Sequence, residues 1–259
     1  MTEQRPAGNP LWIAYEYVVM LVGLSLLALI CLIWMPFALI LHPLLPQRLG
    51  QPLGRAAITA CFRSYLFLLK HLCACRFDLT ALDQLRDEGP LILVANHPSL
   101  LDVVLIVSRL PNVVCVMKAA LMNNILFGSA ARLARYIRND TLLTIILHAR
   151  EEVRDGAQLL IFPEGTRTTH FPLDACTPST GLIAKRTRIP VQTLLIELST
   201  PYLGKAWPLF RRPSLPLTGR VRLGRRFAPP DDVEAFTREL ETYFSQELGG
   251  ASTPAPATP

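Results

Sequence analysis

The 259-residue sequence predicts an α/β fold with a mostly parallel central sheet flanked by helices, preceded by an N-terminal membrane helix or helical hairpin. Short apolar runs alternate with helical patterns after residue 75, as in βα units. A long uncharged run precedes them. Hydrophobic residues make up 51% of the chain and charged residues 18%, and the mean hydropathy is +0.32. This composition excludes an intrinsically disordered chain and is unusually apolar for a soluble enzyme.

The N-terminal segment is predicted to enter a membrane. After a short tail at residues 1–10, residues 11–48 are predicted to be membrane-embedded. The 25 residues from Tyr17 to Leu41 carry no charged side chain. A helix of this length is long enough to cross about 30 Å of hydrocarbon. Pro36 is expected to break this run, so a complete span and a short re-entrant helical hairpin both remain open.

Residues 49–74 predict a second, amphipathic helix. Arg55, Arg63 and Lys70 fall within about 80° on a helical wheel, opposite an apolar face. An interfacial helix on a membrane surface and an ordinary packed helix with a solvated edge both have this pattern. If the preceding run spans the membrane, the basic residues that follow it place the rest of the chain in the cytoplasm. We expect a bacterial inner-membrane protein with a cytoplasmic catalytic domain.

Residues 75–248 are predicted to form the α/β domain, and the small, Pro-rich residues 249–259 a disordered tail. Strands are expected at Arg76–Thr80, Leu91–Ala95, Val113–Met117, Leu159–Phe162, Val191–Ile196 and Arg220–Leu223. Helices are expected at Leu100–Arg109, Asn124–Arg135, Thr141–Arg154, Gly181–Arg188 and Asp231–Leu248.

A first candidate motif follows the expected strand Leu91–Ala95 and reads NHPSLLD, from Asn96 to Asp102. The proline after His97 disfavours a helical conformation there, so His97 is expected in a loop at the carboxyl end of a parallel strand. Asp102 then lies on the first turn of the next helix, within reach of the imidazole. A His held by an Asp is a minimal general base for a hydroxyl, whereas Ser99 and Asp102 alone also fit a helix capping box.

A second motif, PEGTR, follows the expected strand Leu159–Phe162. Gly165 permits close backbone approach, Thr166 offers a hydroxyl, and Arg167 offers a bidentate fork for an anion or a carboxylate. Taken alone, Glu164 and Arg167 fit a structural turn with an ion pair as well as a binding loop.

Together, the two motifs resemble those of the glycerolipid (lysophosphatidic-acid-type, or 1-acylglycerol-3-phosphate) O-acyltransferase family, over roughly Leu91 to Ile196. The resemblance implies that His97 is the general base on the acceptor hydroxyl and that Asp102 orients it. It also implies that the acceptor is bound by Glu164, Gly165, Thr166 and Arg167, with Arg138 as a looser match to a family arginine. The donor implied is acyl-CoA or acyl carrier protein, and no cofactor is expected.

Two departures bear on the acceptor. Thr177–Gly181 lacks the basic residue that family members often carry there, and Arg138 is slightly out of register. Both changes remove expected phosphate ligands. The Tyr136–Asp140 segment, with Pro111 and Asn112, also resembles acyltransferases of bacterial aryl-polyene or xanthomonadin-type pigment clusters.

The net charge of +6 comes from one stretch, Lys205–Arg226, which has seven basic residues and no acidic one. We expect it to meet an anionic membrane or the donor rather than nucleic acid, or to be no more than scattered solvated arginines. No metal-ligand pattern is present, so no metal is expected. The six cysteines are expected to be reduced, mostly buried thiols.

The sequence therefore predicts a membrane-bound O-acyltransferase that acts on a lysophospholipid-like acceptor. Two alternatives remain: an acyltransferase for a non-phosphate acceptor, such as a pigment, an ornithine lipid or a glycolipid, and a non-catalytic membrane scaffold that keeps this fold.

Overall fold

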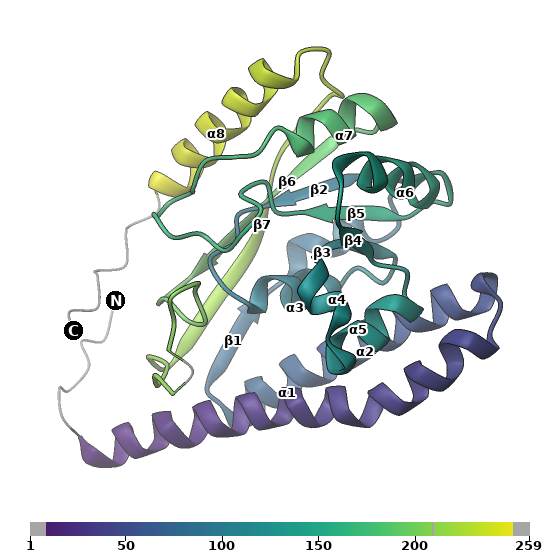
Figure 1. Cartoon of the computed structure of the whole chain (residues 1–259). Coiled ribbons are helices and arrows are strands. Elements are labelled where there is room, and N and C mark those ends of the chain that lie inside the picture. The colour runs from purple at the N-terminus through teal and green to yellow at the C-terminus, as the bar shows by residue number, and fades with distance from the viewer. Residues whose placement is uncertain (1–8, 209, 251–259) are drawn as a thin grey trace.

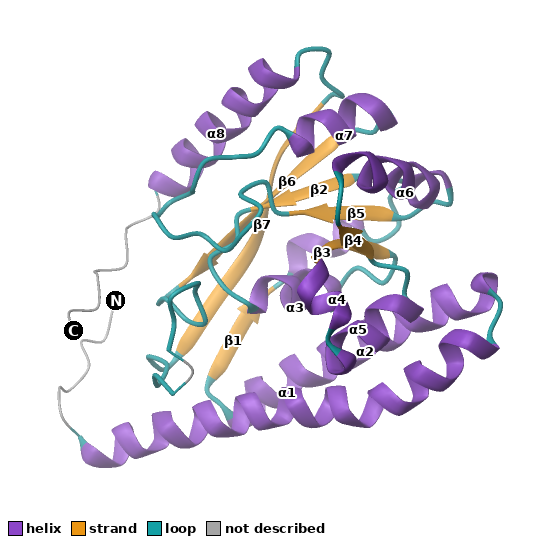
Figure 2. Cartoon of the chain, viewed as in Figure 1, coloured by secondary structure: helices purple, strands orange, loops and turns teal. Residues whose placement is uncertain are grey.

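The computed structural model describes residues 9–208 and 210–250. The two predicted tails, residues 1–10 and 249–259, lie outside the described residues except for residues 9, 10, 249 and 250. Within the described residues one seven-stranded sheet has the order β1-β7-β6-β2-β5-β3-β4 (Figures 1 and 2). All neighbours are parallel except β6 and β7. The strands are β1 (Cys75–Asp78), β2 (Ile92–Ala95), β3 (Val113–Lys118), β4 (Ile137–Asn139), β5 (Gln158–Ile161), β6 (Val191–Leu198) and β7 (Leu217–Phe227).

Helices cover both faces of the sheet. They are α1 (Pro10–Leu44), α2 (Gln47–Leu72), α3 (Leu101–Val107), α4 (Ala119–Asn123), α5 (Ile125–Leu133), α6 (Leu142–Arg154), α7 (Ser179–Thr187) and α8 (Val233–Gly249), with a 3₁₀ helix at Thr80–Leu85. The fully buried β2 sends Leu93 and Ala95 into the core under α2 and α3, and Ile92 and Val94 into the core under α6, α7 and α8. This alternation confirms the predicted fold class, because a strand buried on both faces is apolar throughout.

The sequence prediction was wrong for several elements. The last strand is much longer than Arg220–Leu223, since β7 runs from Leu217 to Phe227 beside β6. Three short elements were missed: β4, α4 and the 3₁₀ helix at Thr80–Leu85. Such short segments have no room to display a helical or strand period.

Pro36 does not break the N-terminal helix, contrary to expectation. Helix α1 continues through Pro36 and ends at Leu44, before Pro46. An internal proline removes one backbone hydrogen bond, and a long helix tolerates that loss at the cost of bending. The chain then returns along α2, so the hairpin consists of α1 and α2 rather than two halves of residues 11–48 (Figure 1). The Tyr65 hydroxyl donates to the Gly23 carbonyl at 3.2 Å across this pair.

Among the described helices, α1 is long and apolar enough to cross a membrane, with a mean hydropathy of 2.8 over its most apolar window. It also packs against α2 and α5 along one side. About 52 Å of helix therefore runs beside the α/β domain instead of projecting away from it (Figure 1).

Part of the basic face of α2 contacts protein, although Arg63 and Lys70 are exposed. Arg55 is buried and forms an ion pair with Glu152 of α6, and its guanidinium also donates to the Asn112 side chain at 2.7 Å and to the Ala134 carbonyl at 3.2 Å. Arg63 donates to the Ser108 carbonyl at 3.3 Å. Two of the three cations on this face thus contact the domain. The helix is packed against protein, but the buried Arg55 differs from the solvated edge expected for that face.

Candidate active site

The site lies at the carboxyl end of β2, where Asn96 and His97 follow the strand. The Asn96 side chain donates to the Ile196 carbonyl at 2.9 Å and accepts from the Ile196 amide at 2.8 Å. These two bonds attach the loop after β2 to the neighbouring strand β6. Because the loop is anchored in this way, His97 leaves the sheet at a defined point.

His97 and Asp102 are in contact. The His97 Nδ1 atom lies 2.8 Å from Asp102 Oδ2, and Asp102 is fully buried on the first turn of α3. The same oxygen accepts the Ser99 amide at 2.8 Å, while the Ser99 hydroxyl accepts the Leu101 amide at 3.1 Å. Asp102 therefore accepts a backbone amide at the start of α3 and holds the imidazole at the same time. The capping-box interpretation and the general-base interpretation of this motif are compatible.

Burial raises the pKa of Asp102 to about 6, against the opposing effect of its hydrogen bond to His97. Among the described residues, Oδ1 of this carboxylate has no hydrogen-bond partner. A buried carboxylate with one unpaired oxygen is costly to ionise. Because Nδ1 of His97 faces Asp102, Nε2 is the nitrogen that remains for a substrate hydroxyl.

The second motif packs directly on the first. Phe162, the first residue after β5, stacks on the His97 ring with centroids 3.9 Å apart and planes 17° apart. The backbone of His97 forms two hydrogen bonds with the second motif loop. Its amide donates to Glu164 Oε1 at 3.0 Å, and its carbonyl accepts the Thr168 amide at 2.8 Å. The two predicted motifs thus form one connected site.

Glu164 holds this site together with both carboxylate oxygens. Besides the His97 amide, they accept the Thr168 hydroxyl and the Asp174 amide, each at 2.9 Å. Burial raises the pKa of Glu164, while these hydrogen bonds oppose the rise. The next residue, Gly165, has φ +67°, a conformation that favours glycine, and Thr166 is half-buried beside it.

Arg167 reaches a segment that the sequence analysis did not select. Its Nη1 donates to the carbonyls of Leu203 and Gly204, at 2.9 and 2.7 Å. The Leu203 carbonyl also accepts the Leu100 amide, at 3.2 Å, from the loop that holds His97. Leu203 has φ +53°, which is uncommon for leucine, and no apolar or charge pattern marks these residues in the sequence.

Arg138 is not brought into contact with His97. It lies in β4, at the far side of the sheet, and donates to Asp140 at 2.7 Å and to Asn123 at 3.0 Å. Three strand spacings, about 14 Å, separate β2 from β4. Arg138 nevertheless lies toward the same carboxyl edge, as does the exposed Lys118 at the end of β3, which the sequence analysis also missed.

Acidic side chains neutralise most of the basic stretch 205–226. Five of its seven cations have an acidic partner, and the pairs are Arg212–Glu16, Arg220–Glu197, Arg222–Glu197, Arg225–Glu239 and Arg226–Glu88. Arg211 instead lies over the Trp207 ring, 4.7 Å from its centroid. The partners come from distant parts of the sequence, so the stretch is far less electropositive than its composition suggests.

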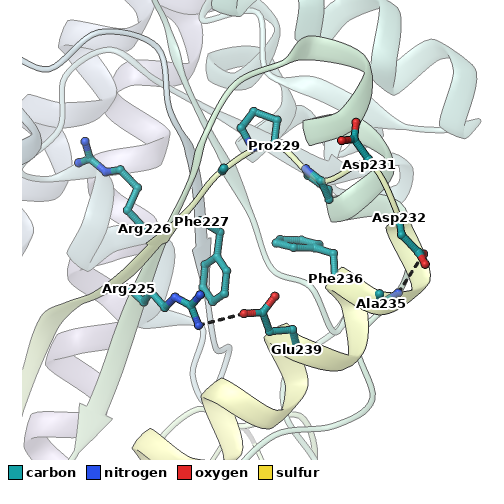
Figure 3. A pocket seen from close by; sticks show the side chains of 11 residues that line it. Arg225, Arg226, Phe227, Pro229, Asp231, Asp232, Ala235, Phe236 and Glu239 are labelled. Atoms are coloured by element: carbon teal, nitrogen blue, oxygen red, sulfur yellow. Dashed lines mark hydrogen bonds and ion pairs between the residues drawn. The ribbon is translucent and has the colours of Figure 1, made fainter.

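A cavity of about 360 Å³ lies at the opposite end of the strands from His97, between the end of β7 and the start of α8 (Figure 3). Phe227 in its lining pairs with Val191 at the beginning of β6, whereas His97 follows the end of β2. Arg225 and Glu239 in the lining pair with each other at 2.9 Å. Its position and internal charge pairing separate this cavity from the His97 site.

In the described part of the chain, no group of three or more His, Cys, Asp or Glu side chains is arranged to hold a metal ion. All six cysteines are free thiols, four of them buried.

The comparisons with known proteins agree with this fold. Residues 76–197, from β1 into β6, match the model of the Acyltransferase family, so this segment is similar to the domains of that family. It contains both motif loops. Helices α1, α2 and α8 and strand β7 lie outside the matched segment.

A Caenorhabditis elegans protein, acl-1, named as a 1-acyl-sn-glycerol-3-phosphate acyltransferase, is 30% identical over 123 residues. The alignment covers 45% of this chain and 47% of acl-1, so the chain spans about half the length of this relative. The crystal structure of the 1-acyl-sn-glycerophosphate (LPA) acyltransferase PlsC from Thermotoga maritima matches with a TM-score of 0.63. That match covers 91% of this chain and 98% of PlsC at 16% identity, which is a likeness of fold.

Proposed function

We propose that the protein is a membrane-associated O-acyltransferase that transfers an acyl group from acyl-CoA or acyl carrier protein to a hydroxyl of a lysophospholipid-like acceptor. The observation that carries the proposal is the 2.8 Å contact between His97 Nδ1 and Asp102 Oδ2 at the carboxyl end of β2, inside the segment that matches the Acyltransferase family model. Ligands of open α/β sheets bind at this edge.

In the proposed mechanism, His97 Nε2 accepts the proton of the acceptor hydroxyl while that oxygen attacks the thioester carbonyl carbon. The new C–O bond gives a tetrahedral intermediate. When it collapses, the C–S bond breaks and the leaving thiolate takes the proton from His97, so the enzyme returns to its starting state. Asp102 stabilises the imidazolium formed in between, and the stacked Phe162 limits rotation of the ring.

The acceptor is proposed to lie along the carboxyl edge of the sheet. Gly165 and Thr166 would line it beside His97, while Glu164 and Arg167 would hold the loop in place. Lys118 and Arg138, at the ends of β3 and β4, offer positive charge to an anionic headgroup on the same edge. A glycerophosphate with one acyl chain is long enough to reach from these cations to the His97 site.

A non-phosphate acceptor is the second candidate, and two observations favour it. The Arg138 guanidinium already forms an ion pair with Asp140. Residues 177–181, which follow the Glu164 loop, contain no basic side chain, and the Thr177 hydroxyl donates to the Pro163 carbonyl at 3.0 Å. These features reduce the positive charge available to a phosphate.

Membrane association is proposed to rest on the apolar side of the α1–α2 pair. Helix α1 leaves large apolar side chains exposed, among them Leu29, Leu32, Ile33, Phe37 and Ile40. The neighbouring helices α2 and α5 add Phe67 and Ile125. Apolar surface of this extent is typical of proteins that insert into a bilayer interface, and the bacterial inner membrane is the proposed location.

The test is acyl transfer by the purified full chain in phospholipid vesicles, with labelled acyl-CoA and labelled acyl carrier protein as donors. The acceptors are 1-acylglycerol 3-phosphate and 1-acylglycerol, which differ only in the phosphate. We expect product with the phosphate-bearing acceptor, formed at least about 100-fold more slowly by the His97→Ala variant. Equal use of both acceptors would favour the second candidate, and no product with either donor from a folded protein would contradict the proposal.

A further inference from the structure

Glu16 is a buried acid in the otherwise apolar helix α1. Its carboxylate forms an ion pair with Arg212 and accepts the Leu215 amide at 3.2 Å. Both partners belong to the connection between β6 and β7, residues 199–216, here called the β6–β7 loop, of which all but residue 209 are described. An ion pair with one member shielded from water is stronger than an exposed one, provided that both partners stay in place.

The same loop contacts the candidate active site from its other side. The Leu203 carbonyl accepts both the Arg167 guanidinium and the Leu100 amide, and the Gly204 carbonyl is a second acceptor for Arg167. Leu100 lies three residues after His97. The β6–β7 loop is therefore a bridge with α1 at one end and both motif loops at the other.

Internal contacts make this bridge stiff. Ser199 and Thr218 bond across its base, where the Ser199 amide donates to the Thr218 carbonyl at 2.8 Å. Trp207 packs edge-on against the buried Tyr202, and its indole Nε1 donates to the Arg211 carbonyl at 3.1 Å. Arg211 precedes Arg212, so the residue that holds α1 is linked through Trp207 and Tyr202 to Leu203.

We propose that Glu16 and Arg212 are a positioning pair for the acyl-transfer site. They dock the β6–β7 loop on α1, and the docked loop presents the Leu203 and Gly204 carbonyls that orient Arg167 and the loop carrying His97. The proposal rests on the proposed function and deepens it, because it couples the membrane-facing helix to acceptor binding. Neither residue touches the reacting atoms, so both act through the β6–β7 loop, and chiefly through Arg167.

The first test is a double-mutant cycle on acceptor kinetics. Glu16→Gln and Arg212→Gln each should lower kcat/KM for the acceptor by about 10-fold, chiefly through KM, and Arg212→Lys should retain part of the wild-type value. In the Arg167→Gln background the same substitutions should cost less than about 2-fold, because the side chain through which they chiefly act is gone. Arg225→Gln, which breaks an exposed ion pair at the opposite end of the strands, is the matched control.

The second test needs no activity. Hydrogen exchange of the full chain in vesicles should be about 10-fold faster or more at the Leu100 and Leu215 amides in Glu16→Gln and Arg212→Gln, and unchanged there in Arg225→Gln. If the protein is inactive with every donor but the two variants show faster exchange at these amides, the proposed function is contradicted. The structural link from Glu16 and Arg212 to the His97 loop is then still supported. Exchange at Leu100 that stays at the wild-type rate, or losses that remain fully additive with Arg167→Gln, would overturn the positioning pair.

Discussion

The His97 imidazole is restrained by contacts of three kinds. Asp102 holds Nδ1, Phe162 covers one face of the ring, and Glu164 fixes the backbone amide. Only 15% of the His97 side chain remains accessible. Restraint of this kind lets a general base meet its substrate in one orientation, which is where much of its catalytic advantage arises.

His97→Ala should lower acyl transfer by about 10²–10⁴-fold, because it removes a positioned base. The fold should survive, since His97 lies in a loop at the edge of the core. The chain offers a matched control in His170, which contacts Asp174 at 2.9 Å in the same manner but is 89% exposed. The prediction fails if His97→Ala and His170→Ala turn over at similar rates in the same vesicles.

Asp102 should give the protein opposite pH responses in activity and stability. The site needs the ionised carboxylate to accept from Nδ1, so acyl transfer should fall as the pH drops through about 6. The raised pKa means that the native state binds this proton more readily than the unfolded state. The contribution of Asp102 to the free energy of unfolding should therefore decrease as the pH rises from about 4 to about 6 and stay constant above.

Asp102→Asn isolates that effect. Ser99 and His97 donate to the same oxygen of Asp102, so the amide oxygen of an asparagine can replace it without rearrangement. The difference in unfolding free energy between wild type and variant, measured by urea titration at several pH values, should follow the predicted curve. A difference that does not vary with pH would contradict it.

At the scale of elements, one buried ion pair, between Arg55 and Glu152, contributes to the docking of α2. Glu152→Ala should destabilise the protein by about 3–5 kcal/mol, because it leaves the Arg55 guanidinium buried without its charged partner. The double variant Arg55→Met/Glu152→Leu should recover most of that loss. Urea unfolding followed by circular dichroism measures both, and equal destabilisation of the single and double variants would contradict the role of the charge.

The elements that sequence reasoning located well are those with a strong local signal. Two apolar segments, Leu91–Ala95 and Leu159–Ile161, are recognisable in the sequence as buried strands. Each of the two motif loops comes directly after one of these strands. Strand β7 was placed too short because Gly219 on one side, and Gly224 with the adjacent Arg225 and Arg226 on the other, interrupt the apolar alternation around Arg220–Leu223. The acidic partner of Arg226, Glu88, lies far away in sequence. Long-range ion pairs of this kind leave no local pattern.

For the candidate site, the sequence indicated His97, Asp102 and the Glu164 loop, since the motif that contains each of them begins directly after a strand. It did not indicate Leu203 and Gly204, which act through backbone carbonyls and so place no demand on side-chain type. It also did not indicate Glu16, which has the appearance of an ordinary residue before an apolar run. Only the folded chain brings Arg212 to it.

At the scale of the whole molecule, the charge of +6 does not produce one open basic face. Because most of the cations in the 205–226 stretch are paired with acids, binding to anionic vesicles should depend on the apolar side of α1 and α2. Raising NaCl to about 1 M, where charges are screened within about 3 Å, should release little protein. Flotation of vesicles at low and high salt measures this, and release of most of the protein by salt alone would contradict it.

The pairing of β1 with β7 sets an order of events during synthesis. Cys75 pairs with Leu217, so the ribosome adds about 140 residues after β1 before its neighbour in the sheet exists. At 5–20 residues per second this takes roughly 7–30 s. Helices α1 and α2 are complete throughout that interval, while the sheet beside them is not. The apolar helix pair therefore leaves the ribosome ahead of the catalytic domain and is free to meet a membrane first.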